Sequence, residues 1–153
     1  MAATKYMFAT FDASTRITTY GGAATPVGTV TVNPGAATEI VIALFTVNGD
    51  PTVGPAVIDG LTFPSGQPSY IDATSPGPSL GLGESSPTWL LTDNFLGSEQ
   101  LGSTPISLSI LYNSQSHPND PTIVNTDPGN VVETTAARPP AGVARVAIAA
   151  VAA

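Results

Sequence analysis

The chain of 153 residues contains no cysteine, and only 10% of its residues are charged. Without cysteine it can form no disulfide framework, thiol nucleophile or cysteine-based metal site, so its stability has to come from packing. Imidazole and indole chemistry are equally sparse, because His117 and Trp89 are the only residues of their kinds. These absences disfavour functions that need clustered reactive side chains.

Basic residues are rare and lie only towards the two ends of the chain. Lys5 and Arg16 stand near the start, Arg138 and Arg145 stand near the end, and ten acidic residues fall within 39–133. Affinity for nucleic acid depends on clustered lysine and arginine, so nucleic acid and anionic membranes are poor partners. We interpret the acidic middle as a solvated surface. The alternative is that the basic ends meet the acidic bodies of neighbouring copies.

Targeting signals are missing from the opening segment "MAATKYMFATFD". It lacks the cationic start and continuous apolar core of a secretory signal. The chain also has no apolar run of about 18 residues that could span a membrane. We therefore expect a cytoplasmic protein, or a virion protein if it is encoded by a phage.

Glycine and proline are abundant, with fifteen of each, and they accompany many Thr, Ser and Val residues. This composition works against long helices and favours short strands joined by turns. The length suits one hydrophobic core. We predict an all-β fold, a single antiparallel β-sandwich of the Ig-like or jelly-roll-like kind with Pro- and Gly-rich loops. Residues 1–137 form the sandwich domain, and 138–153 form a C-terminal arm or last strand.

The clearest strands are indicated by apolar residues at alternating positions or in short runs. Residues 5–12 place Phe8 on one face and Phe11 on the other, which predicts a strand covered on both sides. Residues 40–47 form the longest apolar run and are the candidate central strand, with Leu44 in its middle and a tight hairpin expected at Asn48-Gly49. Residues 106–112 alternate as a half-buried antiparallel strand.

Other segments predict strands less sharply. Val30 and Val32 should face inward from a short strand, and the Pro-rich stretch 51–87 should contribute edge strands at 56–63 and 69–75. The segment around Trp89 fits either a strand or a helical turn.

The segment "HPNDPTIVNTDPG", residues 117–129, holds the only histidine. A catalytic triad would need Ser116, His117 and Asp120 to converge beside an oxyanion hole, and no nucleophile-elbow motif is present. We interpret His117 as a solvent-facing loop residue. No P-loop, dinucleotide-binding fingerprint or zinc-protease motif occurs either, so we expect no catalytic residues, metal or cofactor.

Two ligand sites remain as alternatives to a purely structural role. Oxygen ligands for Ca²⁺ could come from Asp120, Asn125, Asp127 and Asn130, but their spacing fits turn chemistry better than any calcium loop. A sugar-stacking platform could be built from rings at five positions, although core packing is commoner for such residues. These rings are Tyr20, Tyr70, Trp89, Phe95 and Tyr112.

The C-terminal arm begins with Pro139-Pro140 and continues as "AGVARVAIAAVAA". Two prolines hold the chain extended, and the following Ala, Val and Ile residues would expose an apolar strand edge. The arm should therefore be covered, either within its own sandwich or by adding to a sheet edge of a neighbouring copy. We lean towards the neighbouring copy.

The stretch Asp120, Pro121, Thr122, Ile123, Val124 and Asn125, followed by Asp127 and Pro128, resembles a short motif of the PixA/AidA inclusion-body proteins and related "DP-EP" proteins. This resemblance implies a cytoplasmic, non-catalytic β-sandwich that tends to self-associate.

From these observations we expect a non-enzymatic structural or self-assembling protein of the inclusion, coat or virion-decoration type. Its partners should be further copies of itself or neighbouring assembly subunits. The second candidate is a binding module for carbohydrate or another small ligand, and a hydrolase of unknown class is third.

Overall fold

The computed structural model describes residues 3–21, 29–32, 37–74, 77, 80–81, 84–85, 88–97 and 100–125. Its regular elements are all β-strands, which confirms the predicted all-β, sandwich-like fold. The strands are β1 (Ala3–Asp12), β2 (Ile17–Tyr20), β3 (Thr29–Val32), β4 (Thr38–Val47), β5 (Val57–Thr62), β6 (Ile71–Thr74), β7 (Trp89–Asp93), β8 (Gly102–Pro105), β9 (Ser107–Tyr112), β10 (Gln115–Asn119) and β11 (Thr122–Asn125). The predicted C-terminal arm, 138–153, lies outside the described residues.

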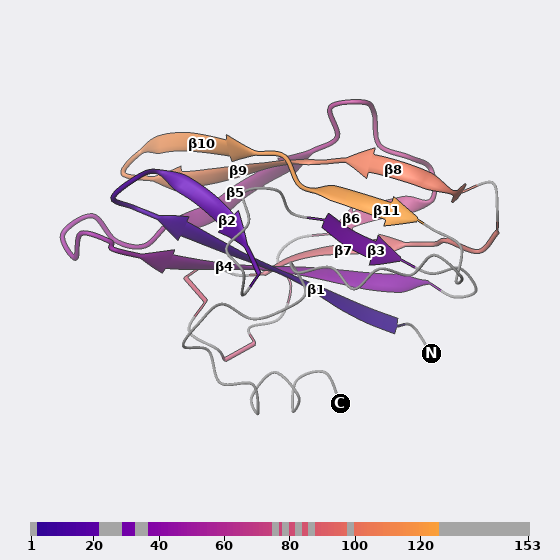
Figure 1. The fold of residues 1–153 in the computed structure, drawn as a ribbon, viewed down its shortest axis with the longest axis horizontal. Helices are drawn as coiled ribbons and strands as arrows, with labels where there is room; N and C mark the ends of the chain where they lie inside the picture. The colour runs from indigo at the N-terminus through magenta and orange to yellow at the C-terminus, as the bar shows by residue number, and fades with distance from the viewer. Residues whose placement is uncertain are drawn as a thin grey trace.

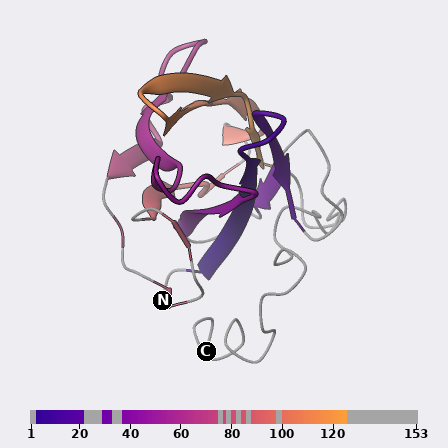
Figure 2. The ribbon, with the colours of Figure 1, turned by 90° about the vertical axis from the view of Figure 1, so that its left-hand side faces the viewer.

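The strands form three sheets (Figure 1). Sheet A has the order β2-β1-β4-β7-β6, sheet B has β3-β11-β8, and sheet C has β10-β9-β5. Viewed from the end of the molecule, the strands surround a common interior (Figure 2). Two pairs run parallel, β1 with β4 and β11 with β3, and the remaining pairs are antiparallel. The sequence did not predict the parallel pairs, because a hydrophobic pattern shows which face is buried and not which strand lies alongside.

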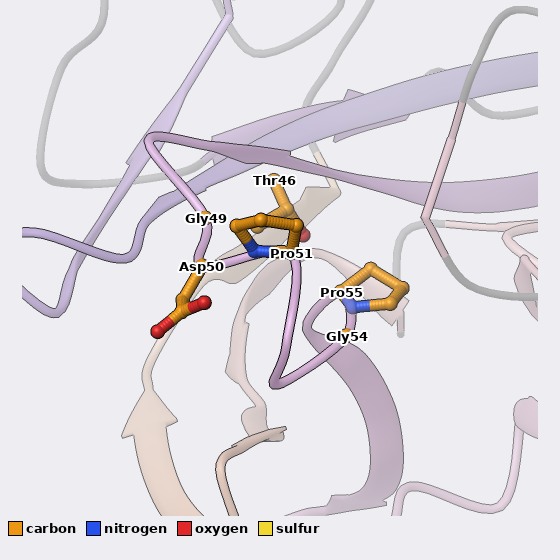
Figure 3. Close-up of a pocket in the computed structure, with 6 residues that line it drawn as sticks. All are labelled: Thr46, Gly49, Asp50, Pro51, Gly54 and Pro55. Atoms are coloured by element: carbon orange, nitrogen blue, oxygen red, sulfur yellow. The ribbon is translucent and has the colours of Figure 1, made fainter.

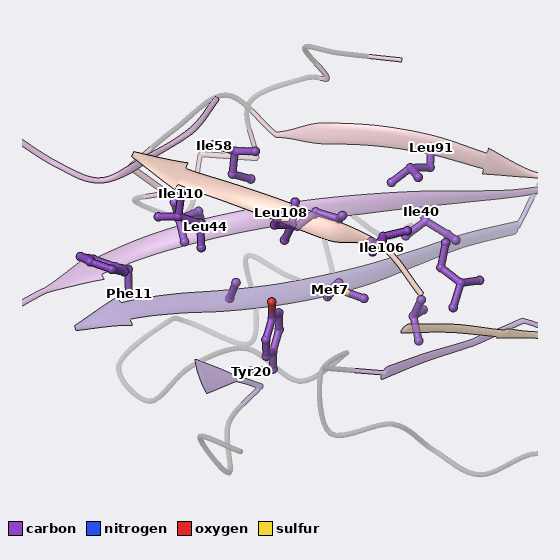
Figure 4. Packing of buried hydrophobic residues seen from close by; sticks show 14 of the residues in the cluster. Met7, Phe11, Tyr20, Ile40, Leu44, Ile58, Leu91, Ile106, Leu108 and Ile110 are labelled. Atoms are coloured by element: carbon purple, nitrogen blue, oxygen red, sulfur yellow. The ribbon is translucent and has the colours of Figure 1, made fainter. Parts of the chain in front are cut away.

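One large core fills the space between sheet A and the other two sheets (Figure 4). Met7 and Phe11 of β1 and Leu44 of β4 point inward, and they are fully buried. Leu108 and Ile110 of β9 meet them from the opposite side. Apolar burial of this kind is the main stabilising contribution in a chain without disulfides.

The outer face of sheet A is apolar as well. Phe8 of β1 packs with Val41, Ala43 and Phe45 of β4, and Leu80 completes this second cluster. Because successive strand residues point to opposite faces, β1 and β4 are buried on both sides. This confirms the double-sided strand predicted for residues 5–12 and the central position predicted for residues 40–47.

The prediction of a tight hairpin at Asn48-Gly49 is wrong. Asn48 does adopt a left-handed conformation with φ of 55°. The chain then leaves sheet A, and the next strand, β5, pairs with β9 instead of β4. Strand β1 pairs along all of β4, and β7 pairs with it only from Thr38 to Ile42. Beyond Ile42, Ser85 bonds to the Leu44 carbonyl on the edge that a hairpin partner would need.

Ser85 ties the end of β4 to the segment that enters β5. Its backbone N–H donates to the Leu44 carbonyl at 2.8 Å, and its hydroxyl donates to the Ala56 carbonyl at 2.8 Å. The Thr46 hydroxyl donates to Ser85 Oγ and accepts from the Ala56 N–H. These bonds lie beyond Ile42, the last residue of β4 that pairs with β7.

The remaining strand predictions agree with the structure. Val30 and Val32 are buried on β3. The two short segments of the Pro-rich stretch form β5 and β6, and both are edge strands. The ambiguous segment at Trp89 is a strand, β7, because it pairs with β4 on one side and β6 on the other.

Shortening Leu44 to alanine should destabilise the fold strongly, because this fully buried side chain lies in the middle of the core. We expect Leu44→Ala to lower the free energy of unfolding by about 2 to 5 kcal/mol. Urea unfolding measures the change. Ile17→Ala is the matched control, since Ile17 is 54% exposed and its truncation should cost far less. Equal costs for the two variants would contradict the assignment of the core.

Candidate functional site

His117 lies on a strand and is half-buried, so its interpretation as a solvent-facing loop residue is wrong. Strand β10 pairs with β9 through a turn in which Asn113 and Ser114 have φ of 51° and 61°. Two successive left-handed residues form the tight turn that suits a two-residue hairpin. The sequence did not predict this hairpin turn because serine, not the usual glycine, occupies its second position.

The structure separates the three residues considered as a triad. The His117 ring packs against Phe11, with ring centroids 5.2 Å apart. Ser116 immediately precedes His117 on the strand, so its side chain points to the opposite face. There its hydroxyl lies 2.7 Å from Ser109 Oγ. Asp120 is exposed after the end of β10. Ser116 and His117 therefore cannot act as a nucleophile and its base.

His117 belongs to a stack of side chains that joins three segments at one end of the sandwich. Phe11 contacts both His117 and Tyr112, and the Arg16 guanidinium lies over the Tyr112 ring at 5.1 Å from its centroid. The Tyr112 hydroxyl accepts a hydrogen bond from the Asp50 N–H at 3.1 Å. We call this end of the molecule, formed by residues 12–17, 47–56 and 112–115, the turn end.

Two carboxylates at the turn end stabilise turns. Asp12 accepts hydrogen bonds from the Ser14 hydroxyl and N–H and from the Asn48 side chain, and these bonds lower the pKa of Asp12. Asp50 accepts from the N–H and hydroxyl of Thr52, which lowers the pKa of Asp50. Carboxylates with lowered pKa are poor proton acceptors, so neither is suited to act as a general base.

An open hollow of about 310 Å³ lies at the turn end (Figure 3). The Asp50 carboxylate points away from the rings of Pro51 and Pro55, and Thr46 is engaged with Ser85 and Ala56. The hollow is shallow and open, and it offers no free nucleophile among its lining residues. These are Thr46, Gly49, Asp50, Pro51, Gly54 and Pro55.

The five rings considered as a sugar platform do not gather on one surface. Tyr20 and Phe95 are fully buried, and Tyr112 is 4% exposed beneath Arg16. Tyr70 and Trp89 pack against the same core. The Tyr20 hydroxyl donates a hydrogen bond to Asn119, and burial, with a smaller effect of Asp120, raises the pKa of Tyr20. These rings serve packing.

The residues considered as alternative calcium ligands are not brought together in the part of the chain that the structure describes. Asp120 is exposed, whereas Asn125 is buried on β11. Asp127 and Asn130 lie outside the described residues. Among the residues that are described, no group of three or more His, Asp or Glu side chains could hold a metal ion.

A buried polar pair, Asp93 and Asn125, connects sheets A and B. The Asn125 side-chain amide donates to Asp93 Oδ1 at 3.3 Å and to the Gln100 carbonyl at 3.0 Å. Asp93 Oδ2 and Asn125 Oδ1 are both buried without a partner in the described structure. Burial raises the pKa of Asp93 to about 6, against the opposing effect of the Asn125 hydrogen bond. A protonated Asp93 can donate a hydrogen bond, which an unpartnered Asn125 Oδ1 needs.

Sequence reasoning missed this pair, although strand alternation carried the signal. Asp93 follows the buried Leu91 by two positions, and Asn125 follows the buried Ile123 by two. Each polar residue thus occupies a core-facing position. Their pairing with each other depends on the packing of β7 against β11, which the sequence does not indicate.

Comparison of the sequence with models of known protein families gives no match, and comparison with curated proteins gives none. None of the described residues belongs to a helix that could cross a membrane. The assignment of function therefore depends on the geometry of the chain itself.

Replacing Asp93 by asparagine should stabilise the protein at neutral pH. Below about pH 4 the Asp93 carboxyl is protonated in both the folded and the unfolded chain. The free energies of unfolding of the wild type and Asp93→Asn should therefore differ least there. Between pH 4 and 6 the unfolded chain loses this proton while the folded chain retains it. The free energy of unfolding of the wild type should therefore fall by about 2 to 3 kcal/mol relative to that of the variant. This difference between the two proteins should become constant above pH 6.

Urea unfolding of both proteins from pH 4 to 7.5 measures this difference. Asp59→Asn, which removes an exposed carboxylate on β5, controls for the change in net charge. If Asp93→Asn and Asp59→Asn gave the same pH profile, the buried carboxyl would not be protonated in the folded protein.

Proposed function

We propose that this protein is a non-enzymatic structural β-sandwich that assembles with further copies of itself, as an inclusion, coat or virion-decoration protein does. The side chains that could perform chemistry are used to hold the fold together. His117 packs on Phe11, Asp12 and Asp50 stabilise turns, and Asp93 pairs with Asn125 between two sheets. This use of reactive groups supports a structural role.

The observation that carries the proposal is the placement of exposed large apolar side chains at both ends of the sandwich. Ile17 is 54% exposed and Val47 is 42% exposed at the turn end. Leu96 is 65% exposed and Leu101 is 40% exposed in the segment between β7 and β8. Ile17 and Val47 lie beside one another, because both pair with Asp12. Contact with a second copy would remove these exposed side chains from water, which favours association.

The small fraction of charged residues supports the same function, because a surface rich in Thr, Ser and Ala has few charged groups to desolvate on contact with a second copy. The net charge of −7 repels identical copies, so apolar contact has to drive the association and salt should strengthen it. The resemblance of residues 120–128 to inclusion-body proteins implies the same kind of protein. No described feature favours the carbohydrate-binding alternative, since the rings that it required are packed in the core.

The proposal predicts that the mass of the purified protein in solution exceeds that of one chain and rises with concentration. Size-exclusion chromatography with light scattering over a dilution series measures it. High salt should not dissolve the assemblies, because burial of apolar surface is weakly affected by ionic screening. A single-chain mass at every concentration would contradict self-assembly.

A further inference from the structure

Asparagine followed by glycine is the dipeptide in which an asparagine side chain loses its amide most easily, because the glycine nitrogen can attack the side-chain carbonyl carbon. Glycine has no Cβ to obstruct that approach. Asn48-Gly49 is the only such dipeptide in the chain. The other asparagines precede a residue with a side chain, and one of them precedes a proline, which has no N–H to react. They are Asn33, Asn94, Asn113, Asn119, Asn125 and Asn130.

Asn48 and Gly49 are accessible to water at the turn end. Both residues are exposed, and Figure 3 shows Gly49 in the loop that leads from β4 towards Pro55. The Asn48 backbone has φ of 55°, outside the strand conformation of β4. Among the described residues, none accepts a hydrogen bond from the Gly49 N–H. The nitrogen that has to attack is therefore free to lose its proton to solvent.

The Asn48 side chain joins the ends of the two longest strands. Its Nδ2 donates to Oδ1 of Asp12, the last residue of β1, at 3.1 Å. Beside it, the Ala13 N–H donates to the Val47 carbonyl at 3.0 Å. We call these two hydrogen bonds the end clamp. The bonds from Ser14 and then Asn48 lower the pKa of Asp12, so its carboxylate is ionised at neutral pH.

Deamidation would change this side chain in two balanced steps. The Gly49 nitrogen forms a bond to Asn48 Cγ, the bond from Cγ to Nδ2 breaks, and ammonia leaves with a proton that replaces the one lost from the Gly49 N–H. Water then opens the resulting cyclic imide at one of its two carbonyl carbons. Opening at Cγ yields aspartate. Opening at the backbone carbonyl yields isoaspartate, in which the main chain runs through Cβ and Cγ.

We propose that Asn48 is a spontaneous deamidation site and that its conversion opens the end clamp between β1 and β4. The product has a carboxylate in place of the Nδ2 donor, and a carboxylate only accepts hydrogen bonds. Two like charges then face each other where Asn48 and Asp12 now bond, and they repel. The site does not depend on the association of copies.

The two products should affect the backbone differently. Aspartate tolerates the left-handed conformation of position 48, so it changes the charge and leaves the path of the chain intact. Isoaspartate lengthens the main chain between Val47 and Gly49. In both cases the ten residue pairs of β1 with β4 keep the core closed, so the modified protein should remain folded.

Ageing the intact protein in mildly alkaline buffer tests the site. Peptide mass spectrometry should show conversion of an amide to an acid at Asn48 well before any other asparagine, and enzymatic methylation of isoaspartate should label the same peptide. Gly49→Ala is the matched control, because its methyl group hinders attack. It fits the fold, since a Cβ at Gly49 lies 3.5 Å from Thr46, an ordinary contact distance.

The control should convert several times more slowly than the wild type. Earlier conversion at another asparagine, such as Asn113 in the β9–β10 turn, would overturn the assignment of the site. Equal conversion of Asn48 in the wild type and Gly49→Ala would overturn it as well.

Hydrogen exchange measures the effect on the end clamp, in the aged wild type and in Asn48→Asp, which supplies the aspartate product in pure form. Exchange of the Ala13 amide should become about fivefold faster, as expected for loss of one hydrogen bond. Exchange at Met7, which is fully buried in the middle of β1, should not change. If Asn48→Asp does not fold, the aged wild type provides the same comparison, because it is modified after folding.

Exchanging donor and acceptor tests the cause. In Asn48→Asp with Asp12→Asn, the amide at position 12 can donate to the carboxylate at position 48, while its Oδ1 still accepts from Ser14. The net charge equals that of the wild type, and exchange of the Ala13 amide should return towards the wild-type rate. An unchanged Ala13 rate in the aged protein and in Asn48→Asp would overturn the opening of the clamp. A double variant as fast as Asn48→Asp would overturn charge repulsion as its cause.

Discussion

The parallel pairing of β1 with β4 is the constraint on which the rest of the sandwich depends. Ten consecutive residue pairs, from Ala3 with Thr38 to Asp12 with Val47, hold the two longest strands side by side. Both strands are buried on their two faces, so each contributes side chains to the main core and to the second cluster. Strands β2 and β7 pair with the outer edges of this unit, and β6 pairs with β7. Sheets B and C then cover the inner face.

The sequence predicted the strands well because alternating apolar positions and apolar runs directly indicate which residues are buried. The double-sided strand at 5–12, the central strand at 40–47 and the alternating strand at 106–112 were all predicted from these patterns. The pattern does not report which strands are neighbours, so the parallel pairs were missed and a hairpin was wrongly expected at Asn48-Gly49. Asn48 has the left-handed φ expected of a turn residue, but Gly49 does not, and the next strand pairs with β9 in another sheet.

The candidate sites were harder to predict because they depend on contacts between distant strands. His117 was assigned to a loop since its neighbours are Pro, Asn and Asp, whereas pairing with β9 makes the segment a strand. Asp93 and Asn125 stood at core-facing positions of two strands, yet their contact appears only when sheet A packs on sheet B. The hollow combines Thr46 of β4 with residues of the loop that follows this strand.

Sheet B has a consequence for how the protein folds during its synthesis. Its parallel pair joins Thr29 to Thr122 and Val32 to Asn125, so strands separated by most of the chain must meet. Such non-local pairing forms slowly, because a long loop has to close before any contact is gained. Until β11 leaves the ribosome, β3 lacks its partner and Val30 and Val32 cannot be enclosed. A nascent chain of this protein therefore carries uncovered core residues while the residues between β3 and β11 are synthesised, a period in which association with other unfinished chains has to be avoided.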